Sequence, residues 1–418
     1  MLLKQTRLLL LLYASFTWSC TGSKGILTKG SMDKVFSVAE KQYESMLQKS
    51  TNLTRYPRTT QADGSTRYVG IGDWTGGFWP GALWYVFDGT KNKKWEDAAI
   101  KWTESLEKNQ YNTNHHDIGF LMYCSYGNAL RHGNNKKYED ILIQSAKSLI
   151  VRYNPKVKSI KSWNTKKSWN GVTWYFPVII DNMMNLELLF YASKKTGNPV
   201  FKNIAMEHAE TTMKNHLRSD FSSYHVVDYD TATGKVLYQQ TNQGFSDNSQ
   251  WARGQAWGIY GFTTVYRETG DKRFLSTAQK MADFYIHHPN LPKDKIPYWD
   301  FNVNQAGYQP DWAYDASKFS FVPRDASAAA ITASGLLEMS RYLGAAGKKY
   351  RNFAIETLKS LSSTQYLAEP GTNGYFLLKH STGSIPHQTE IDTPLVYADY
   401  YFLEALLRYQ NKISFLEP

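Results

Sequence analysis

Apolar stretches with helical spacing recur along the whole chain. They begin near Asp117, Asp181, Trp251, Asp325 and Asp392, roughly 70 residues apart. After most of them comes a break in which Gly is followed by Asn or Asp, as in KKTGNPVF and RETGDKRF, and such a break stops a helix and permits a tight reversal. A second, more polar helix follows, as in FLSTAQKMADFYI, where charged and apolar residues alternate at helical spacing. The pattern predicts repeated pairs of an inner and an outer helix.

The number of such pairs predicts a closed ring. Adding the segments 79–88 and 95–109 gives about six pairs, which a ring of antiparallel hairpins accommodates. We therefore predict an all-α fold, an α/α six-hairpin toroid, with an open solenoid or a bundle of helix pairs as the alternative. No Pro-, Gly- or Ser-rich linker divides residues 21–418, so we expect a single domain there. The segments 224–238 and 295–301 are interpreted as strand-like or loop insertions.

The first 20 residues have the order of a secretory signal. Lys4 and Arg7 precede the apolar stretch 8–18, which is too short to span a bilayer, and Ser19 and Cys20 follow. A cysteine at this place resembles a bacterial lipobox, in which Cys20 would be lipidated; an ordinary signal peptide cut nearby is the alternative. We predict an exported protein that is periplasmic or anchored to the outer membrane. If Cys20 carries lipid, Cys124 has no partner for an intramolecular disulfide.

Charge and aromatic content narrow the classes of partner. The net charge is +11, or +9 without Lys4 and Arg7, which favours anionic partners. The chain holds 13 Trp and 29 Tyr, and their flat apolar faces suit a groove that stacks on sugar rings. Nucleic acid is disfavoured, because the basic residues are scattered, no recognisable binding motif is present and the protein is predicted to be exported.

Acidic residues stand at or just before the predicted starts of inner helices: Asp117, Asp181, Asp325 and Asp392. In a toroid of antiparallel pairs the inner helices run parallel, so these starts gather at one end. Aspartate is also a favoured helix cap, and each of the four can be purely structural. Asp117 follows the polar run NTNHH, and Asp181 follows the aromatic segment WYFP at 174–177, which favours these two for a sugar pocket. The other two are interpreted as structural or supporting.

The longest polar and aromatic run is TNQGFSDNSQWARGQAW, residues 241–257. Trp251, Arg253 and Trp257 lie close together along a helix start, so the Arg253 cation could pair with a carboxylate between indole faces. The structural alternative makes Trp257 a core residue and Arg253 part of an internal ion pair. His225 lies in an insertion and is a candidate for hydrogen bonding to substrate, or an exposed structural histidine.

Several classes of site have no signal in the sequence. No HExxH motif, paired CxxC or EF-hand pattern is present, so the sequence supports no metal and no cofactor. There is also no GxSxG elbow and no phosphate-binding loop, which argues against serine hydrolases and nucleotide-binding enzymes.

These motifs together resemble the unsaturated glucuronyl hydrolases of glycoside hydrolase family 88. The likeness rests on an ordered set of segments that covers most of residues 21–418: WTGGFWPGALW, HHDIGF, DNMMNLELL, SDNSQWARGQAWGIYGF, PYWDFN, RDASAAAITASGLLE and DYYFLEAL. The family fold, an α/α six-hairpin barrel, agrees with the repeat.

The resemblance implies a set of site residues. It makes Asp181 the catalytic acid and base, and Asp117 its partner that contacts sugar hydroxyls. It places the following in the substrate pocket: His225, Gln243, Trp251, Arg253 and Trp257, with Trp74 or Trp79 at the entrance. Ser381 and Ser384, in KHSTGS, match in part a segment that contacts a sulfate or hydroxyl on the leaving sugar, or they form a simple polar turn.

The implied activity is release of a 4,5-unsaturated uronic acid from the non-reducing end of lyase-generated oligosaccharides of the glycosaminoglycan type. Hydration of the C4=C5 double bond replaces direct attack at the anomeric carbon. Two alternatives stay open: an unsaturated rhamnogalacturonyl or ulvan-type hydrolase, which shares the fold and the alkene chemistry, and a sugar-binding lipoprotein without turnover. The sequence leaves linkage, sulfation pattern and oligomeric state undetermined.

Overall fold

The computed structural model describes residues 27–413. The predicted signal peptide and Cys20 lie outside these residues. Among residues 27–413, no helix is both long and apolar enough to cross a membrane.

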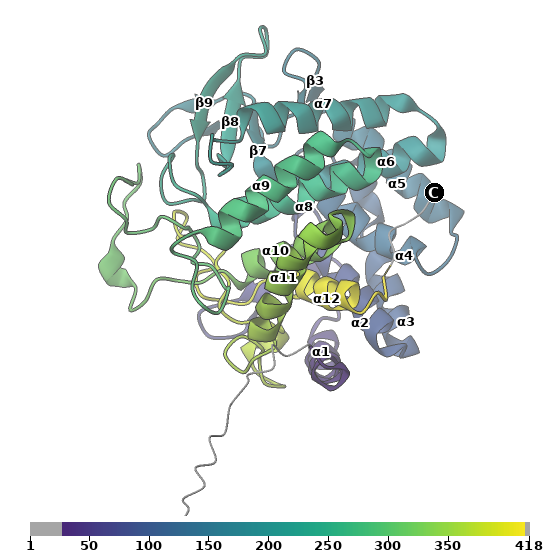
Figure 1. The fold of residues 1–418 in the computed structure, drawn as a ribbon. Coiled ribbons are helices and arrows are strands. Elements are labelled where there is room, and N and C mark those ends of the chain that lie inside the picture. Colours follow the sequence, from purple (N-terminus) through teal and green to yellow (C-terminus); the bar gives the residue numbers. More distant parts are fainter. Residues whose placement is uncertain (1–26, 414–418) are drawn as a thin grey trace, which may run out of the picture.

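The inner wall of the fold is a closed ring of helices (Figure 1). Its members in chain order are α2 Phe78–Thr90, the π-helix η2 Gly119–Gly127 with α4 Asn128–Leu130, the 3-10 helix η3 Ile180–Asn185 with α6 Leu186–Thr196, α8 Ala252–Thr269, α10 Ala326–Tyr342 and α12 Val396–Tyr409. Each member contacts the next, and α12 returns to contact α2. The predicted toroid is therefore confirmed, and the open solenoid is excluded.

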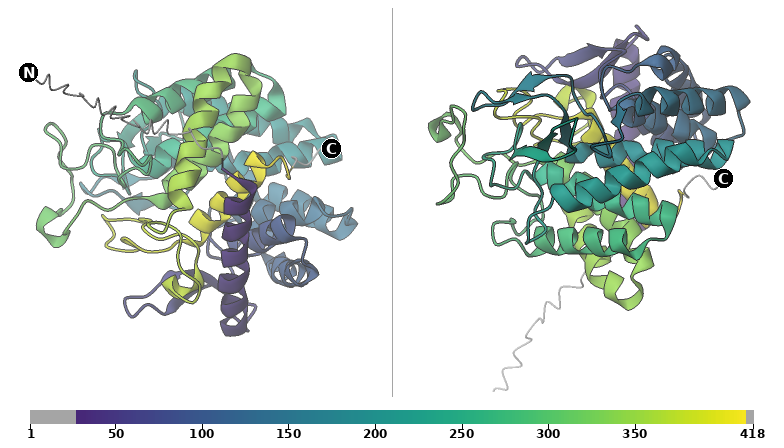
Figure 2. Two further views of the ribbon diagram at one scale, coloured as in Figure 1. Left: turned by 60° about the horizontal axis from the view of Figure 1, so that its bottom comes forward. Right: turned by 90° about the horizontal axis from the view of Figure 1, so that it is seen from above.

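A second layer of helices surrounds this ring: α1 Lys29–Lys49, α3 Lys93–Glu104, α5 Lys136–Ile150, α7 Pro199–Asn215, α9 Lys272–His287 and α11 Gly347–Leu361. The outer helices α3, α7, α9 and α11 each pack on the inner helix that precedes them, and α5 packs on η2. The sixth pair joins the two ends of the described chain, since Tyr43 of α1 donates a hydrogen bond to Asp399 of α12 at 3.3 Å. Figure 2 shows α1 in purple beside the yellow α12.

The predicted helix breaks lie where the sequence puts them. Gly197 ends α6 and Gly270 ends α8, both with positive φ of about 70°, a conformation that glycine adopts without strain. The next residues, Asn198 and Asp271, cap α7 and α9 by accepting backbone N–H bonds. The short sequence signals therefore set the reversals from α6 to α7 and from α8 to α9.

Close backbone packing explains the glycines of WTGGFWPGALW. A Cβ atom on Gly77 would lie 2.2 Å from the Phe120 carbonyl oxygen, and one on Gly81 would lie 2.5 Å from that of Cys124. Both contacts are with η2, so α2 and η2 pack backbone against backbone at these two positions.

Short antiparallel strands and long loops extend from the ring. The strands form four small sheets: β1 Arg55–Thr60 with β2 Thr66–Gly70, β3 Tyr153–Asn154 with β4 Ser159–Ile160, β5 Lys166–Lys167 with β6 Thr173–Trp174, and β7 Pro177–Ile179 with β8 Val226–Tyr229 and β9 Val236–Gln240. The remaining short 3-10 helices are η1 Glu107–Tyr111, η4 Ala316–Lys318, η5 Gly344–Ala346 and η6 Asn373–Tyr375. The predicted insertion 224–238 contains β8, the turn that follows it and the first three residues of β9, whereas 295–301 makes only isolated bridges.

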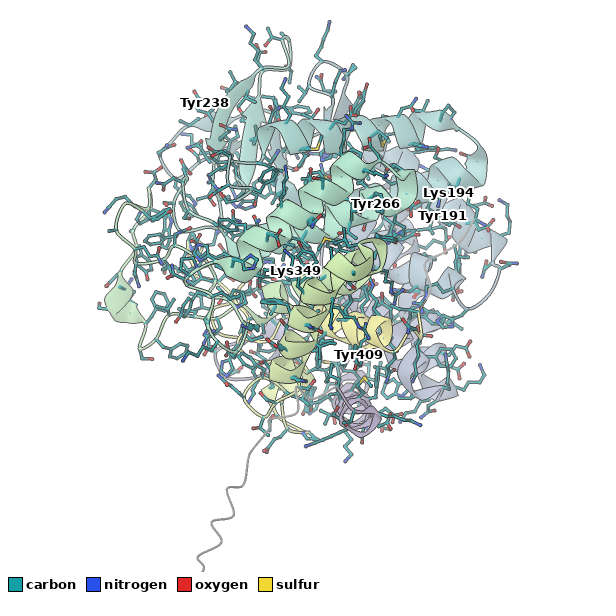
Figure 3. All side chains as sticks on the ribbon, viewed as in Figure 1. Tyr191, Lys194, Tyr238, Tyr266, Lys349 and Tyr409 are labelled. Atoms are coloured by element: carbon teal, nitrogen blue, oxygen red, sulfur yellow. The ribbon has the colours of Figure 1, made fainter. Side chains whose placement is uncertain are left out.

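The two ends of the ring differ in Figures 1 and 3. Strands β8 and β9 and the long loop between α9 and α10 lie on the left side of Figure 1. Figure 3 labels Tyr191, Lys194, Tyr266 and Tyr409, which mark the C-terminal turns of α6, α8 and α12 on the other side. The strands and long loops therefore extend from the end where the inner helices begin.

Candidate active site

A cavity of about 360 Å³ opens at the end of the ring where the inner helices begin, within the size range of small-ligand sites. Asp117 precedes η2, Asp181 lies in the first turn of η3, Arg253 lies in the first turn of α8 and Tyr397 lies in that of α12, and all four side chains line this cavity. The predicted convergence of the helix starts is therefore observed.

Asp181 is held in a state that favours a neutral carboxyl. Burial is the main cause that raises its pKa, to about 7; the Arg253 charge opposes this rise and the Asp117 charge adds to it. Its Oδ2 atom has no hydrogen-bond partner among the described residues. Asp181 is thus a carboxyl that can hold a proton near neutral pH, and its Oδ2 atom lies in the wall of the cavity without a hydrogen bond to any other described residue.

Asp117 has the opposite setting. Burial alone would raise its pKa, but the neighbouring His116 and His115 outweigh this effect and hold the pKa below the usual value. Its Oδ1 atom lies 3.2 Å from His116 Nε2, and its Oδ2 atom lies 3.4 Å from His115 Nδ1. Asp117 is therefore an anion beside Asp181. It lies just before the π-helix η2, and π-helical turns are frequent at functional sites.

His225 faces Asp181 as a neutral imidazole. Its Nδ1 atom accepts backbone N–H bonds of 3.2 Å from both Asn242 and Gln243, so the ring proton resides on Nε2. This Nε2 atom lies 3.7 Å from Asp181 Oδ2 and completes no hydrogen bond among the described residues. Burial, with the charge of Lys166 next, places the His225 pKa well below its usual value. His225 can thus donate one hydrogen bond into the space beside Asp181, and it is buried rather than exposed.

Arg253 makes a buried ion pair and also holds a loop. Its Nη1 atom donates to Asp325 at 2.7 Å and to the Thr382 carbonyl at 2.5 Å, and Nη2 donates to the Gly383 carbonyl at 2.6 Å. Gln243 donates to the same Gly383 carbonyl at 3.1 Å. Both residues line the cavity, as predicted, but they also position its wall. Asp325 caps α10, which supports its interpretation as structural.

The predicted tryptophans take three different places. Trp74 lines the cavity, whereas Trp79 is buried in the core. Trp251 lies behind the wall, with its ring 4.3 Å from the His225 ring and 4.6 Å from the Arg253 guanidinium carbon. Trp257 is buried behind the cavity wall, and its indole N–H is close enough to Asp181 to lower the pKa of that carboxyl, yet it completes no hydrogen bond with any described residue. Trp74 therefore offers a face to a ligand, and Trp251 orients its neighbours.

The structure also corrects the prediction for Ser381. Ser381 is fully buried, pairs through its backbone with Thr393 and does not line the cavity. Ser384 does line it, with its Oγ atom 2.7 Å from His387 Nδ1. The short antiparallel pairing of the 381–393 loop turns these two serines to different sides. Asp392, interpreted as structural, pairs with His380 at 2.6 Å.

The cavity also contains residues that the sequence analysis missed. Arg58 and Glu390 form a bidentate ion pair at its rim, and Lys166, Trp163 and His387 line the same side as the β5–β6 hairpin. No local pattern marks them, because β1, the hairpin and the 381–393 loop are far apart in sequence. Four non-glycine residues at positions 380–392 have positive φ, a strain that clusters at ligand sites.

The comparisons with known proteins decide the family. No family model matches the chain. It is 45% identical to an unsaturated glucuronyl hydrolase of Formosa agariphila, with 92% of each chain aligned. It is also 32% identical to an unsaturated chondroitin disaccharide hydrolase of Streptococcus agalactiae, with 85% of each aligned. The chain belongs to the unsaturated glucuronyl hydrolases, glycoside hydrolase family 88. It is a glycosidase, so the alternative of a binding protein without turnover is set aside.

Solved structures agree with this family. A crystal structure of an unsaturated glucuronyl hydrolase specific for heparin matches with a TM-score of 0.85 and 45% identity, covering 92% of this chain and 98% of that one. The enzyme from Bacillus sp. GL1 matches with a TM-score of 0.79 and 29% identity over 90% and 95% of the two chains. The same toroid therefore supports this family of glycosidases in all three.

Proposed function

We propose that this glycosidase releases 4,5-unsaturated uronic acid from the non-reducing end of glycosaminoglycan fragments made by lyases. Its family membership and the charged, aromatic cavity support this substrate class. The solved structure of an enzyme specific for heparin and the relative named for chondroitin disaccharides both point to glycosaminoglycan substrates. A rhamnogalacturonyl or ulvan-type substrate is the second candidate, but no feature of the cavity favours it.

The reaction uses the electron-rich double bond of the substrate. A lyase product has its C4=C5 bond attached to the ring oxygen, so C4 accepts a proton and C5 gains oxocarbenium character. Water then adds to C5, and the hemiketal opens to a C5 ketone with a hydroxyl left at C1. The C1 hemiacetal expels the leaving sugar as an alcohol, and one water is consumed. The spacing rule for paired carboxylates around an anomeric carbon therefore does not apply.

The opposed pKa shifts of the two aspartates carry the assignment of roles. Asp181, with a pKa of about 7, gives its proton to C4 and, once ionised, takes a proton from the attacking water. Asp117 stays ionised, because its pKa is lowered, and accepts hydrogen bonds from sugar hydroxyls. Its negative charge also helps to keep the proton on Asp181.

The buried polar atoms without partners supply the rest of the site. His225 Nε2 and Trp257 Nε1 both lie beside Asp181. Buried donors of this kind cost free energy unless a ligand or water satisfies them. We assign them to the substrate uronate and to the Asp181 carboxylate that forms after proton transfer.

The test follows the ultraviolet absorbance of the conjugated double bond with unsaturated disaccharides from heparin, chondroitin and hyaluronan. The wild-type protein is expected to remove the absorbance, and the product formed in deuterium oxide should carry deuterium at C4. Asp181→Asn should leave the absorbance constant. Asp271→Asn is the matched control, because asparagine caps α9 as well as aspartate does. Constant absorbance with the wild-type protein on all three substrates contradicts the proposal.

Export with a lipid anchor is a separate proposal, which rests on residues 1–20. We expect Cys20 to be acylated and the protein to fractionate with membranes of the producing cell. Metabolic labelling with a fatty-acid analogue should mark the wild-type protein and not Cys20→Ser. Equal labelling, or none, in the two proteins contradicts the lipobox.

A further inference from the structure

One of the cations that line the cavity has no carboxylate partner. Arg58 is paired with Glu390 and Asp73, and Arg253 is paired with Asp325. Lys166 lines the same cavity, but no carboxylate oxygen of the described residues lies within ion-pair distance of it. The cavity therefore holds one positive charge that the protein itself does not balance.

Lys166 is fixed in place by its hairpin and by an aromatic ring. It lies in β5, where it pairs with Trp174 of β6, and its side chain is half-buried. Its Nζ atom lies 4.9 Å from the centre of the Trp163 ring. The Trp163 ring in turn lies edge-on to His225, with centroids 5.8 Å apart. The ammonium group thus lines the cavity, and two rings, those of Trp163 and His225, lead from it to the Asp181 carboxyl.

The groups that face Lys166 from the other elements are neutral. The Lys166 charge acts on His225, next to β8, and on His387, in the 381–393 loop. Burial is the larger cause in both cases, and it lowers the pKa of His387 to about 4, so His387 is uncharged at neutral pH. Its Nδ1 atom is engaged by Ser384, and Trp169 packs against its ring with centroids 4.8 Å apart. Neutral polar groups beside a single cation suit a compact anion better than a neutral hydroxyl.

We infer that Lys166 is a specificity residue that binds a sulfate group on the leaving sugar. The inference rests on the proposed function, because it is that reaction which places a leaving sugar toward the rim while the unsaturated ring lies against Asp181. It also moves recognition of an anionic substituent away from Ser381, which is buried, and onto the β5–β6 hairpin that lines the cavity. The hydrogen-bonded Ser384–His387 pair then supplies one neutral donor beside the sulfate, which is His387 Nε2–H when Ser384 donates to Nδ1.

The experiment compares two unsaturated heparin-type disaccharides that differ only in sulfation of the leaving glucosamine. We expect kcat/KM of the wild-type enzyme to be higher for the sulfated substrate, and Lys166→Met to lower the sulfated-to-unsulfated ratio by about tenfold, mainly through KM. Separate substrates sulfated at N2 and at O6 show which position Lys166 reads. Lys166→Arg should retain most of the preference.

The neighbouring lysine provides the control. Lys167 is exposed and, as the next residue of the strand, points to the opposite face, so Lys167→Met should leave the ratio unchanged. Added salt should weaken the preference of the wild-type enzyme more than that of Lys166→Met. A structural role for Lys166 would change neither the ratio nor its salt dependence.

Two results overturn the inference. In one, Lys166→Met lowers kcat/KM equally for both substrates, which would place the lysine on the uronate carboxylate. In the other, the ratio does not change. Failure of the proposed function itself looks different, since no disaccharide, sulfated or not, would then lose its absorbance with the wild-type enzyme.

Discussion

Two carboxyls inside the ring, Asp181 and Glu404, differ in whether other residues satisfy their oxygens. At the helix starts, Asp181 Oδ2 and His225 Nε2 have no hydrogen-bond partner among the described residues. Two turns further along α12 from Tyr397, about 10 Å away along the axis, Glu404 is buried more deeply, with 5% of its side chain exposed against 13% for Asp181. Its oxygens accept from Tyr85, Tyr260 and Ser334, and it pairs with Arg408.

The cavities beside these two carboxyls also differ in volume. The cavity beside Asp181 measures about 360 Å³, whereas the one beside Glu404 measures about 60 Å³, space for little more than water. Burial alone therefore does not identify a reactive carboxyl. What marks Asp181 is burial together with an unsatisfied oxygen and space for a ligand, whereas Glu404 is part of the core.

The largest difference is expected in catalysis. Asp181→Asn removes the proton donor and should lower kcat by about a thousandfold or more, because general acid–base catalysis contributes on that order. Steady-state assay of the absorbance loss measures this, with circular dichroism to verify folding. If correctly folded Glu404→Gln loses more activity than Asp181→Asn, then Asp181 is not the reactive carboxyl and Glu404 is not merely structural.

The next effect concerns stability. Glu404→Gln leaves the buried Arg408 without part of its charge balance and should lower the free energy of unfolding by about 3 kcal/mol. Denaturant unfolding checks this, and the activity per folded molecule should stay close to that of the wild type. A change below about 0.5 kcal/mol would place Glu404 outside the structural network.

A smaller effect of opposite sign is expected for Asp181 itself. Its pKa is raised from 3.8 to about 7 in the folded protein, so the unfolded chain releases the proton first as pH rises, and stability is lost between those values. The pKa shift sets an upper limit of about 4 kcal/mol for this effect. Because the carboxyl lies beside an open cavity, we expect Asp181→Asn to stabilise the protein by about half of that near pH 8 and by much less near pH 4. Thermal unfolding at both pH values measures the difference, and equal effects at the two would contradict the raised pKa.

The pH dependence of kcat provides a test that requires no substitution. Because Asp181 must begin protonated, kcat should fall about tenfold per pH unit above its pKa of about 7, while Asp117 stays ionised throughout. Activity should thus be highest on the acidic side of neutral. A flat profile into the alkaline range would assign the proton to another group.

Much of the fold was readable in short sequence signals. The Gly-Asn and Gly-Asp breaks at 197–198 and 270–271 ended the inner helices and capped the outer ones, since both steps depend on local backbone conformation. Asp117 and Asp181 could be singled out because each begins an inner helix near aromatic or polar neighbours. Asp325 and Asp392 also stand at or just before an inner helix but lack such neighbours, and both form structural ion pairs.

The sequence by itself determined the pairs of helices, their order and the gathering of the helix starts at one end, because hydrophobic periodicity and capping act over a few residues. Only the tertiary structure decided which aspartate keeps its proton, which arginine holds the 381–393 loop, that Ser381 is buried and that Lys166 is left without a carboxylate. These properties depend on burial and on charges brought together from distant segments, and no local pattern along the chain contains them.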